Sequence, residues 1–155
     1  MQINMPVIVV SISYRLSAMG WLFSMEMQSQ GVTNIGLRDQ WKALEWIKEN
    51  IAGFGGDPEN VTIWGQSAGA FSVGALTLAY GGDNSGLFQR AIMSSGTSFA
   101  SHGNLIKAQT LYNNITNSTG CHYAIDSLQC LRDRKPKPHS HVHIYQYLTL
   151  SLSPF

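Results

Sequence analysis

Charged residues are scarce in this chain. Asp, Glu, Lys and Arg make up 12% of its 155 residues, whereas an ordinary soluble domain carries about 25%. The formal net charge is +1, and the basic residues gather only at Arg132, Arg134, Lys135 and Lys137. A nucleic-acid-binding domain presents a broad basic patch, so no nucleic-acid partner is predicted. With 44% hydrophobic residues, the composition is typical of the interior part of a larger globular fold.

Long hydrophobic runs are also missing. The longest, such as Val7 to Val10, are far shorter than the roughly 20 residues that span a bilayer, so no transmembrane segment is predicted. A signal peptide needs a basic start, an apolar run and a cleavage site of small residues. Residues 1–6 lead directly into a strand-like segment instead. The chain is therefore expected to begin inside a fold, without a leader of its own.

The apolar residues that are present alternate between two periods. The β-branched run at residues 7–13 is typical of a strand covered on both faces. Further strands are predicted at residues 61–64 and 88–94, and a helix at residues 105–113. Another set recurs with the period of one helix face: Leu37, Trp41, Leu44, Ile47 and Ile51. Alternating strands and helices predict an α/β fold with a mostly parallel sheet.

A Gly-x-Ser-x-Gly motif lies between a predicted strand and a predicted helix. It comprises Gly65, Gln66, Ser67, Ala68 and Gly69. A serine hydroxyl is a weak nucleophile, so an esterase must expose it, remove its proton and bind the oxyanion that forms. In this motif the serine sits on a strained turn, and the N–H that follows it faces the oxyanion. We therefore predict a nucleophile elbow with Ser67 as the catalytic residue and Ala68 as an oxyanion-hole donor.

The pentapeptide alone discriminates poorly between functions. At typical Gly and Ser frequencies it arises by chance in about one chain of this length in twenty. The apolar strand before it and the helical pattern after it favour the nucleophile. On these grounds alone, a turn of small residues that packs a helix on a sheet remains the alternative.

Several further segments extend the motif. FGGDPENVTIW occupies residues 54–64 directly before it, SYRL residues 13–16, NIGLRDQ residues 34–40, and LFQRAIMSSG residues 87–96. Together with the motif they resemble the type B carboxylesterases and lipases, the family of the cholinesterases and fungal lipases. The likeness covers about residues 4–133 and has no gaps between residues 34 and 96.

The resemblance implies a partial α/β-hydrolase domain over residues 1–133. It implies a carboxylic ester hydrolase that forms an acyl-enzyme on Ser67, needs no cofactor or metal, and acts on small-molecule or lipid esters. In the family, a glycine-rich oxyanion segment precedes the strand at Val7, and the acidic and histidine members of the triad follow the position of residue 155. We therefore expect a truncated fragment that is inactive or weakly active alone. The alternative is a non-catalytic fragment or an adhesion-like relative.

The five histidines do not supply an obvious substitute base. Nothing in their spacing places one beside Ser67, and histidines in loops and tails are typically solvated. The alternating set at residues 139, 141 and 143 would share one face of an extended segment, yet no metal site is predicted there. The five are His102, His122, His139, His141 and His143.

Two cysteines and two sequons indicate a secreted protein. The family resemblance implies a disulfide between Cys121 and Cys130, with reduced thiols as the alternative, and a disulfide implies an oxidising compartment. Asn114 and Asn117 each begin a glycosylation sequon in a polar segment. A third sequon, at Asn60, abuts a predicted buried strand and is expected to be unused.

The likeness to the family stops near residue 133. Residues 134–155 form a divergent tail that ends in an uncharged, β-prone run from Tyr145 to Ser153. We interpret the tail as a disordered segment, with read-through of non-coding sequence in a truncated gene model as one hypothesis for its origin. The alternative is a divergent edge strand.

Overall fold

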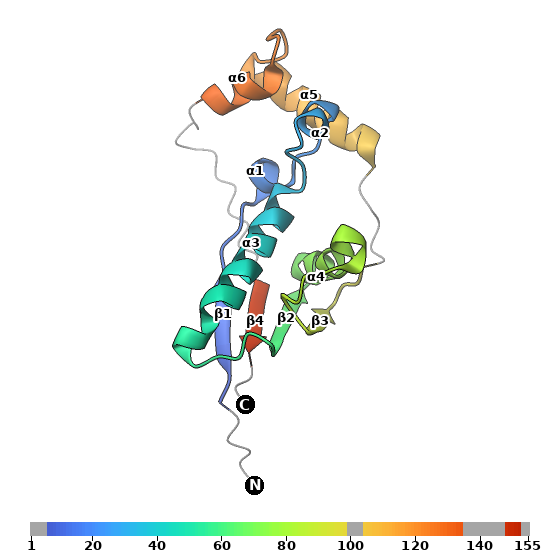
Figure 1. Cartoon of the computed structure of the whole chain (residues 1–155). Helices are drawn as coiled ribbons and strands as arrows, with labels where there is room; N and C mark the ends of the chain where they lie inside the picture. The colour runs from blue at the N-terminus through green and yellow to red at the C-terminus, as the bar shows by residue number, and fades with distance from the viewer. Residues whose placement is uncertain (1–5, 99–103, 135–147, 153–155) are drawn as a thin grey trace. The chain divides into compact units, whose positions relative to one another are not determined.

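The computed structural model describes residues 6–98 and 104–134, together with the backbone of residues 148–152. Helices and strands are both present (Figure 1), which confirms the α/β class. The chain divides into two compact units. The first unit comprises residues 1–14, 37–101 and 145–155, and the second comprises residues 15–36 and 102–144.

The first unit is built on a four-stranded sheet with the order β1-β4-β2-β3. Its strands are β1 (Ile8–Ile12), β2 (Val61–Gln66), β3 (Arg90–Ser94) and β4 (Leu148–Leu152). β2 and β3 pair in parallel, while β4 is antiparallel to both β1 and β2. β1, β2 and β3 therefore run in the same direction, as the predicted mostly parallel sheet requires. β4 comes from the divergent tail and has a neighbour on each side, so it is an interior strand and not the edge strand of the alternative interpretation.

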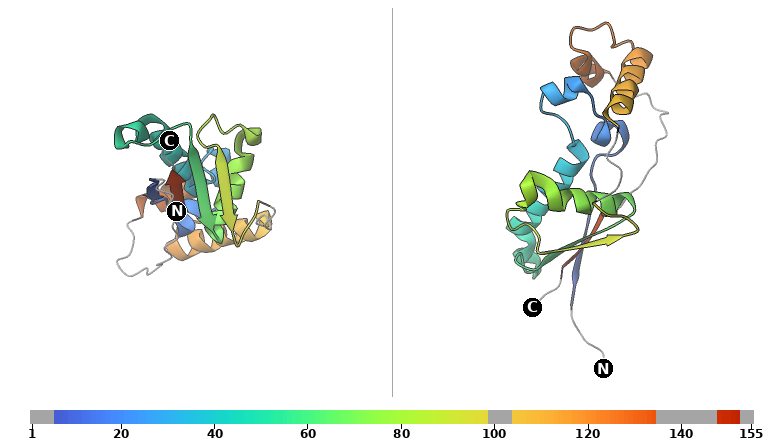
Figure 2. Two further views of the ribbon diagram at one scale, coloured as in Figure 1. Left: turned by 90° about the horizontal axis from the view of Figure 1, so that it is seen from below. Right: turned by 90° about the vertical axis from the view of Figure 1, so that its right-hand side faces the viewer.

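Two helices supply the rest of the first unit's core. They are α3 (Ile35–Asn50), most of which belongs to this unit, and α4 (Ala68–Leu78), which packs against β2 and β3 (Figure 2). Short 3-10 turns follow them, η1 (Ile51–Phe54) and η2 (Ala79–Gly82). The predicted helix face is confirmed, because its later members Leu44, Ile47 and Ile51 are buried and its first two are partly buried. The fully buried side chains include Leu44, Ile47, Val61, Ile63 and Val73.

The sheet is covered on one face only within the described residues. Burial alternates along β2, where Val61, Ile63 and Gly65 are buried while Trp64 and Gln66 are exposed. β1 alternates in the same way, with Val9 59% exposed. The prediction that the first strand is covered on both faces is therefore wrong for this structure, because its helices pack on a single side.

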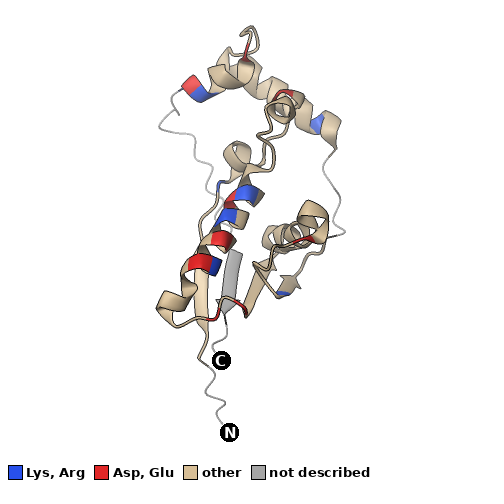
Figure 3. Cartoon of the chain, in the orientation of Figure 1, with Lys and Arg blue, Asp and Glu red and all other residues tan. Residues whose placement is uncertain are grey.

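The outer surface of α3 is strongly charged. Acidic and basic residues follow one another along this helix (Figure 3). Lys42 pairs with Glu45 at 2.6 Å, and Lys48 pairs with Glu59 at 2.6 Å. Both pairs are partly solvent-exposed, so they contribute little to the free energy of unfolding.

The second unit is helical. It contains α1 (Ser17–Trp21), α2 (Met25–Ser29), α5 (Leu105–Thr119) and α6 (Ser127–Asp133). Its core is formed by Leu22, Met27, Tyr112 and Leu128. In the part of the chain that the structure describes, no helix is long and apolar enough to cross a membrane.

α5 extends well beyond the predicted residues 105–113. The Asn104 side chain caps its start by accepting hydrogen bonds from the N–H groups of Ile106 and Lys107. Its end is at Gly120, which adopts the left-handed conformation that glycine tolerates. The added turns are polar in sequence, but Thr116 continues the buried face begun by Tyr112.

Candidate active site: a strained serine between strand and helix

Ser67 is the single residue between the end of β2 and the start of α4. It is exposed, and its φ of 51° and ψ of −119° lie in a region that a side chain disfavours. Such a conformation costs about 1 to 3 kcal/mol and persists only where the surroundings enforce it. The predicted turn from strand to helix is therefore present, with the serine at its apex.

Main-chain hydrogen bonds hold Ser67 from both sides. Its N–H donates to the carbonyl oxygen of Ser94 at the end of β3, at 2.9 Å. Its own carbonyl oxygen accepts from the N–H of Phe71 in the first turn of α4, at 3.1 Å. The serine backbone thus joins the neighbouring strand to the following helix, so its side-chain direction is set by the fold.

Gly65 lies where the strand before the serine and the helix after it come into close contact. A Cβ on Gly65 would lie 2.2 Å from the carbonyl oxygen of Gly69. Real Cβ atoms essentially never approach another heavy atom closer than 3.0 Å. The strand before the serine and the helix after it therefore touch through backbone, and only glycine at position 65 permits that contact.

Two glycines outside the motif also shape the turn. A Cβ on Gly96 would lie 2.9 Å from the Ser67 carbonyl oxygen, and one on Gly74 would lie 2.6 Å from Cα of Ser98. The segment after β3 is thereby held close against α4. Neither glycine is predictable as part of the turn from sequence, because their spacing from Ser67 follows no local motif.

Ala68 begins α4, and Gln66 before the serine is exposed. The first four N–H groups of a helix have no acceptor within the helix, and the helix dipole favours negative charge at this end. Both features suit a developing oxyanion beside Ser67. The assignment of Ala68 as a donor stays a prediction.

A buried polar cluster lies beneath the first turn of α4. Gln40, which is fully buried, donates to Ser72 Oγ at 3.3 Å, and Ser72 donates to the Ala68 carbonyl oxygen at 3.1 Å. Burial raises the pKa of the Tyr14 hydroxyl above its ordinary value, and the polar side chain of Gln40 partly offsets this rise. These groups connect the end of β1, α3 and α4, so they support the helix that carries Ala68. Sequence patterns did not reveal this cluster.

Among the residues that the structure describes, none that could act as a base is hydrogen-bonded to Ser67. There, no histidine or carboxylate hydrogen-bonds the Ser67 hydroxyl, and no three His, Cys, Asp or Glu side chains are grouped to hold a metal. His122 belongs to the second unit, where its ring lies 3.4 Å from that of Tyr123 between centroids. His102, His139, His141 and His143 lie outside the described residues.

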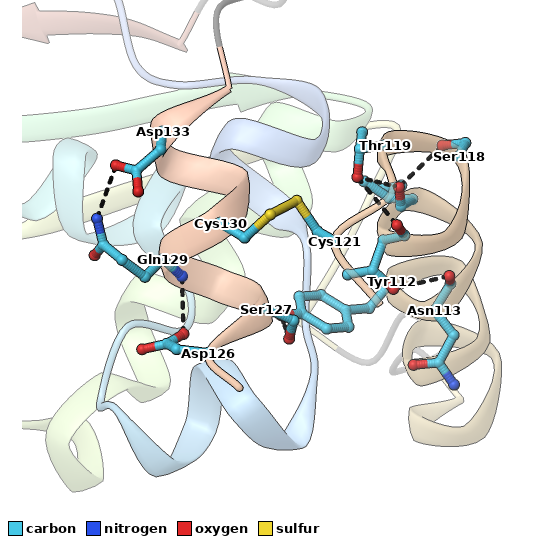
Figure 4. Close-up of a disulfide and its surroundings, with 12 residues drawn as sticks. Tyr112, Asn113, Ser118, Thr119, Cys121, Asp126, Ser127, Gln129, Cys130 and Asp133 are labelled. Carbon is cyan, nitrogen blue, oxygen red and sulfur yellow. Dashed lines mark hydrogen bonds between the residues drawn. A yellow bond between two sulfur atoms is a disulfide. The ribbon is translucent and has the colours of Figure 1, made fainter. Parts of the chain in front are cut away.

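The predicted disulfide between Cys121 and Cys130 is present in the second unit (Figure 4). It joins the segment after α5 to α6, with 5.6 Å between the two Cα atoms. Hydrogen bonds surround it: Tyr112 Oη and Ser127 Oγ lie 2.7 Å apart, and Asp126 caps α6 by accepting from the N–H of Gln129 at 2.8 Å. The disulfide and the capped helices form one local structure.

Comparison with known protein families agrees with this geometry. The family model described as "Carboxylesterase family" matches residues 2–143. A secreted triacylglycerol lipase of Gibberella zeae is 46% identical over an alignment of 134 residues that covers 83% of this chain and 23% of the lipase. Lipase 2 of Geotrichum candidum is 44% identical over 85% of this chain and 25% of its own length. Neuroligin-3 of Mus musculus is 38% identical over 83% of this chain and 15% of its own length. The chain thus spans about a quarter of the length of the lipases that it matches.

Proposed function

Since this chain belongs to the carboxylesterase family, we propose that it carries the nucleophile of a carboxylic ester hydrolase, and that this nucleophile is Ser67. The observation that supports the proposal is the exposed serine with a φ of 51° on the one-residue turn between β2 and α4. A serine that only packed a helix on a sheet would have no need to be exposed at this turn, whereas Ser67 is exposed.

The chemistry is acyl transfer in two stages. Ser67 Oγ attacks the ester carbonyl carbon while a base accepts its proton, and the tetrahedral oxyanion receives a hydrogen bond from the Ala68 N–H. Collapse of this intermediate breaks the bond to the alkoxy oxygen, which takes the proton from the base and leaves as the alcohol, while the acyl group stays on Ser67. Water then attacks the acyl-enzyme, the acid is released and the serine is restored. Each step is proton transfer and carbonyl addition, so no cofactor is required.

The proposed substrates are small-molecule or lipid esters. The fungal relatives at 44 to 46% identity are named lipases, and one is named a triacylglycerol lipase. For the 155-residue chain by itself we propose only weak turnover, because no base contacts Ser67 among the described residues. Loss of a triad member from a serine hydrolase costs several powers of ten in rate.

We further propose that the protein is secreted. The Cys121–Cys130 disulfide supports this, because disulfides persist in oxidising compartments. A relative at 46% identity is itself named as secreted.

Active-site titration with a fluorescent organophosphonate tests the nucleophile. The purified chain is incubated with the probe, and intact mass and peptide mapping locate the adduct. We expect slow labelling that approaches one probe per chain and is abolished in Ser67→Ala. The matched control is Ser85→Ala, because Ser85 is also exposed and has the same φ of 51°, but does not join a strand to a helix.

Two results would contradict the proposal. Labelling that persists in Ser67→Ala would place the reactive group elsewhere. A chain that is folded by circular dichroism and remains unlabelled at saturating probe would show that the elbow does not activate its serine, and would favour the non-catalytic alternative.

A further inference from the structure

Three glycosylation sequons occur in this chain, beginning at Asn60, Asn114 and Asn117. A sequon is a necessary signal for N-glycosylation but does not ensure it, since a bulky and hydrated glycan must also fit the folded surface. The structure places the three asparagines in different surroundings, and those surroundings separate them.

Asn60 is poorly placed to carry a glycan. Its side-chain oxygen accepts a hydrogen bond from Arg90 of β3, and its backbone N–H donates to the Asp57 carbonyl oxygen at 3.1 Å. The next residue, Val61, is fully buried and begins β2. A glycan on Asn60 Nδ2 would crowd the Arg90 side chain that donates to the neighbouring Oδ1, where β2 and β3 begin within the sheet that carries the elbow.

The other two asparagines lie near the end of α5 in the second unit. Asn114 and Asn117 are exposed, whereas Tyr112 and Thr116 are buried on the opposite face. Neither asparagine amide makes a side-chain hydrogen bond among the described residues. Both side chains are therefore exposed to solvent, and no hydrogen bond within the described residues would have to break for a glycan to be attached.

Only one of this pair is expected to be occupied. Side chains three residues apart on a helix are neighbours, with their Cβ atoms about 5 to 6 Å apart. A glycan on either amide would therefore crowd the other. The two sequons compete for a single glycan.

The end of α5 favours Asn117. The enzyme that glycosylates a sequon must reach both the asparagine and the hydroxyl two residues later. In the first sequon that hydroxyl is on Thr116, which is 3% exposed and donates to the Asn113 carbonyl oxygen. In the second it is on Thr119, which also donates to main-chain carbonyl oxygens but is only partly buried. The second sequon occupies the last three residues of α5 before Gly120, and terminal helical turns fray readily.

We propose that Asn117 is a site of N-linked glycosylation and that it carries the only glycan of this chain. In the transfer, Asn117 Nδ2 bonds to the anomeric carbon of a lipid-linked oligosaccharide diphosphate. The bond from that carbon to the lipid diphosphate breaks, the diphosphate leaves, and the amide loses one proton. The inference rests on the proposed secretion, because the donor is present only in the secretory pathway.

Expression of the 155-residue chain behind a heterologous secretion leader in a yeast host tests the site without depending on the native route. An endoglycosidase that leaves one sugar on the asparagine allows the glycan to be counted by intact mass and located by peptide mapping. We expect the wild-type chain to carry one glycan, located at Asn117. The Asn117→Gln variant should lack this glycan. The matched variants Asn114→Gln and Asn60→Gln should retain full occupancy of Asn117.

A secreted wild-type chain without glycan, or one whose glycan maps to Asn114 or Asn60, would overturn the inference. If a variant is not secreted, translation in the presence of microsomes gives the same count of glycans without a need for export. Organophosphonate labelling of Ser67 is measured on the same preparations. If the wild-type chain is labelled at Ser67 but carries no glycan at Asn117, this inference alone is refuted and the proposed nucleophile is unaffected.

Discussion

Replacement of Gly65 by alanine adds a single methyl group where β2 meets α4. The new Cβ would lie 2.2 Å from the Gly69 carbonyl oxygen, 2.3 Å from its carbonyl carbon and 2.8 Å from the Ala70 nitrogen. Ordinary van der Waals contact begins at 3.4 Å. All three neighbours are backbone atoms, so no side-chain rotation relieves the overlap. The strand or the helix must move by about 1 Å, judged from typical contact distances.

The size of the effect follows from the rigidity of these neighbours. Overpacking a core costs about 1 to 3 kcal/mol where side chains can adjust. Here only backbone can move, so we expect Gly65→Ala to lower the free energy of unfolding by about 3 kcal/mol or more. With a urea m-value of about 2 kcal/mol per molar, the unfolding midpoint would fall by about 1.5 M.

Equilibrium urea unfolding followed by tryptophan fluorescence measures this shift. Trp41, Trp46 and Trp64 all belong to the first unit, so the signal reports mainly on the part that contains the elbow. Gly53→Ala is the matched control, because a Cβ there meets nothing within 4 Å and its φ is not left-handed. If Gly65→Ala unfolds at the same urea concentration as Gly53→Ala, the backbone contact at the elbow is not as close as the structure shows and the reasoning fails.

Two further predictions concern the disulfide and the buried tyrosine. Cys130→Ser opens a loop whose ends are 9 residues apart in sequence, and in the chain-entropy model this costs about 2 to 3 kcal/mol. Urea unfolding followed by far-ultraviolet circular dichroism should show the loss, which reductant should reproduce in the wild type but not deepen in the variant. The raised pKa of Tyr14 means that the unfolded chain ionises first as pH rises above the ordinary value of 10.0. Stability is therefore expected to fall from that pH upward until the folded tyrosine also ionises. Tyr14→Phe should weaken this fall, and an unchanged pH profile of the urea midpoint would show that Tyr14 is not buried as described.

Local features of the chain were predictable from sequence because their physics is local. The helix face from Leu37 to Ile51 follows from periodicity, and the elbow at Ser67 follows from two glycines at a fixed spacing between a strand and a helix. The pairing of Cys121 with Cys130 was implied by family resemblance and is present. The roles of Ser67 in chemistry and of Ala68 in oxyanion binding remain proposals, because geometry without a substrate does not test them.

Other features depend on contacts that no local pattern describes. The last turns of α5 are polar in sequence and lie beyond the predicted residues 105–113, yet they are helical, and Thr116 is buried there on the same face as Tyr112. The tail run that includes residues 148–152 read as disordered or as an edge strand, whereas β4 pairs with both β1 and β2. The closeness of Gly96 to the Ser67 carbonyl oxygen depends on the parallel pairing of β2 with β3.

By itself, the sequence determined the α/β class, the position of the strained serine and the cysteine pair available for a disulfide. These depend on residue type and short-range spacing, which survive in the linear chain. The tertiary structure decided the strand order, the glycines that hold the segment after β3 against α4, the buried cluster of Tyr14, Gln40 and Ser72, and which sequon hydroxyl is buried. Each of these is a contact between residues far apart in the chain, and its free energy exists only once folding has brought the partners together.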